Sequence, residues 1–209
     1  LDLSLLNGSI NVSNLSVDKL AGSSFKASGL FDNIGGIPEL KGVRLDAKFN
    51  DLSRLFRLLG VSVPLISEAM GTVTLVGKID GSALKPLVDL KLEGAGASIK
   101  TNGKVSFLPV VGGFEGNLKV AHSDLTEMFK FLGIDYHSRG KLGGLDLEST
   151  IKADLSGLTL GNLKAQLGTV PINGMAKILL SGPKIKIITD LNTGRIVASR
   201  FLPASADAP

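Results

Sequence analysis

The sequence contains no cysteine and no tryptophan, and only 5% of its residues are aromatic, against 44% that are hydrophobic. Without cysteine there is no disulfide framework and no thiolate chemistry, and the apolar surface has to be built from aliphatic side chains. No apolar run approaches the ~20 residues of a transmembrane helix. No signal peptide opens the sequence, which starts with Leu1 inside an alternating segment. We therefore expect a fragment of a longer protein, with any targeting or anchoring segment lying upstream.

The charge of the chain is nearly balanced. There are 23 basic and 19 acidic residues, which gives a net charge of +4. The lysines are spread along the chain rather than clustered, which favours a solvated face over a nucleic-acid footprint. We expect no nucleic-acid partner.

Outside two short segments, apolar and polar residues alternate with the period of a β-strand. Asn7-Gly8 and Asn102-Gly103 have the form of two-residue hairpin turns, and residues 33–38 have the composition of a loop. We expect one all-β domain spanning residues 1–209. The predicted strands include residues 1–5, 9–12, 25–31, 43–49, 72–79, 88–93, 98–101, 104–107, 114–120, 145–153, 163–167, 175–180 and 184–188.

The two exceptions are short amphipathic helices, predicted near residues 51–59 and 124–132, at sites 73 positions apart. Each begins with an Asp that can cap the first free amides and ends before a glycine, Gly60 or Gly133. Their apolar residues fall at i, i+3, i+4 and i+7, so each helix has one face that can cover the sheet. These cover residues are Leu52, Leu55, Phe56, Leu59, Leu125, Met128, Phe129 and Leu132.

The strands around the helices correspond to one another at nearly the same offset. Leu45 and Ala47 match Leu118 and Val120 at 73 positions, and Val73 matches Leu145 at 72. This repetition indicates an elongated array that grows by adding units. The predicted units are residues 1–42 (partial), 43–113 and 114–191, and residues 203–209 form a flexible tail.

Alternating strands give a sheet with one wet face and one aliphatic face. The aliphatic face has to be covered, because each buried side chain of this kind contributes roughly 1.5–3 kcal/mol. Two short helices are too small to cover such a sheet. Either it closes on a conventional dry core, or it stays open as a trough that an aliphatic ligand fills. The helices could instead lie on a membrane surface, aided by Arg54, Arg57 and Lys130, but packing on the sheet is the better interpretation for helices of about ten residues.

The repeated unit resembles the AsmA family, which includes the TamB group. The unit is an aliphatic strand, Asp-Leu-x-x-(Leu/Met)-Phe-(Arg/Lys)-x-Leu-Gly, and further alternating strands. The closest matches are Gly42–Gly60 with Gly71–Gly81, and Phe114–Gly133 with Gly143–Leu167, within a similarity that covers most of residues 40–190. The resemblance implies an elongated, curved antiparallel sheet of trough or taco-like form in the periplasm. It also implies an anchor in the inner membrane, absent from this chain, and a role in moving phospholipid toward the outer membrane.

The sequence offers little for catalysis or metal binding. His122 and His137 are the only histidines and lack the spacing of a zinc site, and His122 fits a helix boundary. Gly71–Ile79 superficially resembles a phosphate-binding loop, but the spacing is wrong and no Ser or Thr follows Lys78. No pair of carboxylates stands out as acid and base. We expect no enzyme activity, no metal and no cofactor.

The expected function is therefore the binding or transfer of phospholipid or another acyl lipid in an aliphatic groove, with envelope proteins as further partners. The alternative is a periplasmic scaffold for outer-membrane biogenesis, with a closed dry core and partners recruited at the sheet edges. Aliphatic positions of the alternating strands are predicted to line the groove: Leu45, Val73, Leu75, Leu90, Leu92, Ile99, Val105, Leu118, Val120, Leu145, Leu147 and Ile151.

Overall fold

The computed structural model describes residues 1–20, 22–51, 71–107, 112–131, 136, 138–180, 186–197, 199 and 202, with the side chains of residues 19, 20 and 131 excepted. These residues form one large antiparallel sheet and one helix with defined bounds, α2 (Leu125–Phe131). The strands are β1 (Asp2–Leu6), β2 (Ser9–Leu20), β3 (Ser23–Asp32), β4 (Glu39–Phe49), β5 (Val73–Ser82), β6 (Leu87–Gly94), β7 (Ala97–Ser106), β8 (Gly113–His122), β9 (Leu145–Asp154), β10 (Gly157–Leu167), β11 (Val170–Leu179) and β12 (Lys186–Thr193).

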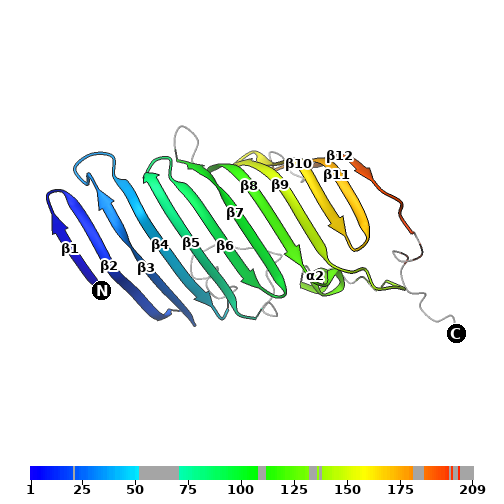
Figure 1. Cartoon of the computed structure of the whole chain (residues 1–209), viewed down its shortest axis with the longest axis horizontal. Coiled ribbons are helices and arrows are strands. Elements are labelled where there is room, and N and C mark those ends of the chain that lie inside the picture. Colours follow the sequence, from blue (N-terminus) through cyan, green and yellow to red (C-terminus); the bar gives the residue numbers. More distant parts are fainter. Residues whose placement is uncertain are drawn as a thin grey trace.

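The twelve strands lie in sequence order, β1 to β12, and each pairs with its neighbours in the antiparallel sense. The sheet is curved and does not close, so β1 and β12 are its two edges (Figure 1). This confirms the predicted mainly-β fold. In the described part of the chain, no helix is long and apolar enough to cross a membrane.

Alternation along each strand and direct pairing between strands put the aliphatic residues on one face. One residue from each of ten consecutive strands, β2 to β11, pairs directly with the next, and every residue in this row is apolar. We call it the aliphatic row: Val17, Phe25, Ala47, Leu75, Leu92, Ile99, Val120, Leu147, Ala165 and Ile172. The neighbouring residues along each strand point to the opposite, polar face.

The two predicted hairpin turns have different outcomes. Asn7-Gly8 joins β1 to β2, with φ values of 48° and 76°, as a tight turn of this kind requires. The prediction for Asn102-Gly103 is wrong, because both residues lie inside β7. The turn comes earlier, at Ala95-Gly96, where φ is 52° and 77°.

Gly103 serves close packing rather than a turn. A Cβ atom built there would lie 2.7 Å from the Cα of Gly116 and 2.9 Å from the Cζ of Phe114. The absence of a side chain at Gly103 therefore leaves room for the ring of Phe114, which reaches over β7 from β8. The same reason explains Gly94 on β6, where a Cβ would lie 2.7 Å from the Cγ2 of Val73.

Full burial is confined to few side chains, many of them at one rim of the sheet. The buried apolar residues among those described are Val43, Ala47, Val73, Val88, Leu125, Leu142, Leu163 and Val170. Helix α2 follows β8 at this rim (Figure 1). The backbone N–H of Leu125 donates to the carbonyl of Gly143 at 2.8 Å, and the N–H of Gly168 donates to the carbonyl of Gly144 at 2.7 Å. The connection before β9 thus ties the helix to the β10–β11 turn.

The predicted helix near residues 124–132 is confirmed as α2. The Oδ1 of Asp124 accepts a hydrogen bond from the N–H of Thr126 at 2.8 Å, which caps the first turn and lowers the pKa of Asp124. The Lys130 ammonium pairs with Glu127 at 2.7 Å. The other predicted helix, near residues 51–59, lies outside the described residues except for Asp51, and so does the predicted tail at 203–209.

Candidate functional site

The candidate site is the aliphatic face of the sheet, on which the register places all twelve residues predicted to line a groove. Five of them belong to the aliphatic row, at directly paired positions on neighbouring strands from β5 to β9. These five residues are Leu75, Leu92, Ile99, Val120 and Leu147.

The other seven predicted residues lie in parallel rows on the same face. Leu45, Leu90 and Leu118 share a row that is interrupted by Gly77, Thr101 and Ser149. Val73 and Leu145 belong to the row at the rim of the sheet where α2 lies. Ile151 belongs to the row that contains Val43 and Val88. Val105 pairs with Phe114. The predicted residues are therefore on one surface, but they do not form one continuous stripe.

Most of this surface is only half-buried. Val73 is 0% exposed, whereas the other eleven predicted residues are half-buried, and none of the twelve is fully exposed. In a sheet packed face to face on another layer, such inward side chains interdigitate and lose most of their exposure. The described residues thus leave a broad aliphatic surface partly open to solvent.

The opposite face carries charges of both signs. Lys119 on β8 donates to Glu148 on β9 at 2.6 Å, and this hydrogen bond lowers the pKa of Glu148. Lys100 lies directly between Lys91 and Lys119 in the register of β6, β7 and β8. Like charges at opposed positions repel, so this row stays stable only where water and neighbouring carboxylates screen it. The polar face is a solvated face.

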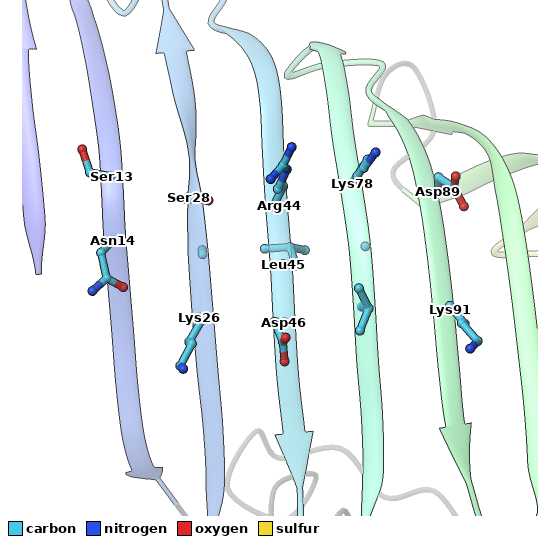
Figure 2. A pocket seen from close by; sticks show the side chains of 13 residues that line it. Ser13, Asn14, Lys26, Ser28, Arg44, Leu45, Asp46, Lys78, Asp89 and Lys91 are labelled. Atoms are coloured by element: carbon cyan, nitrogen blue, oxygen red, sulfur yellow. The ribbon is translucent and has the colours of Figure 1, made fainter.

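A hollow of about 460 Å³ lies on the polar side of β2 to β6. Figure 2 shows its charged side chains on neighbouring strands, with Arg44 beside Lys78 and Lys26 beside Asp46. Arg44 and Lys78 are directly opposed, and Asp89 faces Lys78 from the next strand. Six charged side chains line the hollow, which makes it unsuitable for an acyl chain.

Three of the eight predicted cover residues belong to the described part of the chain with their side chains. Leu125 is 1% exposed, and Met128 and Phe129 are half-buried. The Phe129 ring meets the Tyr136 ring edge-on, with centroids 5.7 Å apart. The remaining cover residues lie outside the described residues: Leu52, Leu55, Phe56, Leu59 and Leu132.

His122 does more than mark the helix boundary. It sits on the aliphatic side at the end of β8, 5% exposed. Its Nδ1 accepts from the N–H of Asp124 at 3.1 Å, so Nε2 carries the proton and donates to the carbonyl of Ala95 at 2.9 Å. His122 therefore joins the β6–β7 turn to the start of α2. His137 lies outside the described residues.

The sequence interpretation missed half of the aliphatic row. Val17, Phe25, Ala47, Ala165 and Ile172 extend it across β2, β3, β4, β10 and β11. Each of these residues lies in a segment where apolar and polar residues alternate, so the sequence does indicate that it belongs to a strand. Whether it lines up with the predicted residues depends on bulges within β2 and β10, which shift the pairing of the strands.

The described residues contain no group of three or more His, Cys, Asp or Glu that could hold a metal ion. Comparison with protein-family models, with characterised proteins and with solved structures gave no significant match.

Proposed function

We propose that this chain binds the acyl chains of phospholipid or a related lipid on its aliphatic face, as a segment of a lipid-transfer protein of the bacterial envelope. The observation that carries the proposal is the aliphatic row, which crosses ten strands without a polar residue and is largely half-buried. An apolar surface of this extent marks a place where a ligand or partner binds.

The dimensions and chemistry suit an acyl chain. Ten neighbouring strands spaced by about 4.8 Å extend the row over roughly 40 Å. Each CH₂ group that leaves water contributes about 0.8 kcal/mol. The side chains along the row are aliphatic or, at Phe25, aromatic, so no polar group has to lose its water when an acyl chain lies against them.

The resemblance of the repeated unit to the AsmA family supplies the cellular setting of the proposal. In that setting the curved sheet is one part of a periplasmic trough built from repeats, anchored in the inner membrane through a segment outside this chain. The strand connections after β4 and after β8 are both long. They begin at the same rim of the sheet and are four strands apart, which is the spacing expected of a repeated unit and supports this part of the proposal. The charged polar face would then meet the aqueous periplasm.

Half-burial favours this function over the closed, dry scaffold. A closed core would bury Leu75, Leu92 and Leu147 as fully as Val73. Among the described residues, those three remain half-buried while Val73 is not exposed at all. No reaction is proposed, and the binding of lipid needs no residue with acid, base or nucleophilic chemistry.

Native mass spectrometry of the purified chain with phospholipid tests the proposal. We expect lipid adducts on the wild-type chain and their loss in Leu92→Asp, which places a carboxylate between Leu75 and Ile99 in the aliphatic row. Val76→Asp is the matched control, because Val76 is an exposed aliphatic residue on the polar face. A wild-type chain that takes up no lipid, or equal loss of lipid in both variants, would contradict the proposal.

A further inference from the structure

The rim of the sheet opposite α2 carries exposed apolar side chains at or next to its strand connections. Strand direction alternates, so the connections β3–β4, β5–β6, β7–β8 and β9–β10 all lie at this rim (Figure 1). At the other rim, apolar residues next to the connections are buried, as Val73 and Val170 are. We call the exposed set the apolar rim residues: Ile37, Leu87, Phe107 and Leu155, which are 53%, 56%, 41% and 74% exposed.

Backbone hydrogen bonds join neighbouring connections along this rim. The N–H of Ala83 donates to the carbonyl of Pro38 at 2.8 Å, which joins the β5–β6 connection to the β3–β4 connection. The N–H of Phe107 donates to the carbonyl of Leu84 at 3.0 Å, which joins the end of β7 to the β5–β6 connection. Connections that are two strands apart lie about 10 Å apart, so the apolar rim residues form a row of roughly 30 Å.

Two ammonium groups accompany the middle of this row. Lys85 lies in the β5–β6 connection, and Lys104 on β7 is directly opposite Leu87. Both lysines are exposed, and neither forms an ion pair with a carboxylate of the described residues. Glu115 is opposite Lys104 on the next strand, but its ion pair, at 3.8 Å, is with Lys152. The two lysines are therefore available to a ligand outside the chain.

The other carboxylates of this rim are largely engaged within the protein. Asp80 and Asp154 each accept a hydrogen bond from a backbone N–H, and Asp32 pairs with Lys41 at 2.6 Å. Glu39 accepts no hydrogen bond within the described part of the chain. The part of the rim best suited to an anionic partner is therefore at the β5–β6 and β7–β8 connections, away from Glu39.

We propose that this rim rests on the surface of a lipid bilayer that contains anionic lipid. The apolar rim residues enter the headgroup region, and the ammonium groups of Lys85 and Lys104 contact lipid phosphates. Single side chains on separate turns offer a protein partner no continuous apolar core, whereas a fluid bilayer admits each of them separately. This contact goes beyond the proposed function and does not depend on lipid binding by the aliphatic face.

Flotation of the 209-residue chain with phospholipid vesicles tests this contact. We expect the wild type to float with vesicles of phosphatidylcholine and phosphatidylglycerol. A chain carrying Leu87→Ser and Phe107→Ser should bind at least about tenfold more weakly, because two apolar side chains no longer leave water. Val76→Ser removes an exposed aliphatic side chain from the polar face and should change nothing. Lys85→Gln with Lys104→Gln should weaken binding to these vesicles and not to vesicles of phosphatidylcholine alone.

The absence of tryptophan from the sequence allows a direct test of which residues enter the bilayer. The fluorescence of Phe107→Trp should shift to the blue when vesicles are added, and that of Val76→Trp should not. Leu92→Asp, on the aliphatic face, should float as the wild type does, so vesicle binding and lipid uptake are measured separately. A wild type that stays in the vesicle-free fraction, equal blue shifts at positions 76 and 107, or loss of flotation in Leu92→Asp alone would overturn the proposal.

Discussion

Strand β5 contains three positions that separate an open aliphatic face from a closed core. Val73 is 0% exposed at the rim, Leu75 is half-buried in the aliphatic row, and Val76 is 51% exposed on the polar face. Replacing each in turn by Asp introduces the same side chain into the same strand, so the general cost of Asp in a strand, up to about 1 kcal/mol, is shared by all three.

The expected losses beyond that shared cost follow from exposure. At Val76 the new carboxylate stays in water and lies opposite both Asp46 and Lys91. It therefore adds almost nothing to the shared loss of stability. At Leu75 roughly half of the ~1.5–3 kcal/mol of a buried aliphatic side chain is lost, or about 0.8–1.5 kcal/mol. At Val73 an unpaired carboxylate would be buried, which costs several kcal/mol.

Thermal unfolding followed by far-ultraviolet circular dichroism measures these losses. For a chain of this size, each kcal/mol lowers Tm by about 2–4 °C. We therefore expect Leu75→Asp to melt about 2–6 °C below Val76→Asp, and Val73→Asp to be largely unfolded. If Leu75→Asp unfolds the protein as Val73→Asp does, the aliphatic face is a closed core and the reasoning from half-burial is refuted.

Further predictions concern the rim, the strand glycines and one ion pair. His122→Ala should lower the free energy of unfolding by about 2–4 kcal/mol in chemical denaturation, because two hydrogen-bond partners lose their contact with the ring; an unchanged midpoint would refute this role. Gly116→Val should cost at least about 1–3 kcal/mol, since its Cβ would lie 2.7 Å from the Cα of a glycine on β7, whereas Gly35→Ala, with open space around it, should change stability by less than about 0.5 kcal/mol. The hydrogen bond from Lys41, with those from a serine and a backbone amide, lowers the pKa of Asp32 from 3.8 to about 2. Because the pKa of Asp32 is lower in the folded chain than in the unfolded chain, the ionised carboxylate stabilises the fold fully above its ordinary pKa of 3.8, and this stabilisation is lost as the pH falls toward 2. An NMR titration of Asp32 should show a midpoint at about 2. The Lys41→Met substitution should raise that midpoint.

The strands could be predicted from the sequence because alternation is a local property. Burial of one face forces a period of two, and that period is visible without any knowledge of partners. The turn at Asn7-Gly8 was equally local. The Asn102-Gly103 dipeptide looks the same, but the close packing between Gly103, Gly116 and the Phe114 ring makes it part of a strand. Such a contact joins residues of neighbouring strands and leaves no local signal.

The extent of the candidate site depends on register, and register was less accessible. Bulges within β2 and β10 decide which of their residues meet the rest of the aliphatic row. The role of His122 was hidden for a related reason, because its two partners come from the β6–β7 turn and the start of α2. Its position before a helix indicated a boundary but carried no information about the turn.

The most direct test of lipid binding on the aliphatic face is photo-crosslinking from two neighbouring residues. A benzophenone side chain introduced at Leu75 projects from the aliphatic face, and one introduced at Val76 projects from the polar face of the same strand. After incubation with radiolabelled phospholipid and irradiation, the proposed function predicts strong labelling from position 75 and little from position 76. Equal labelling from both positions, or stronger labelling from position 76, would contradict it.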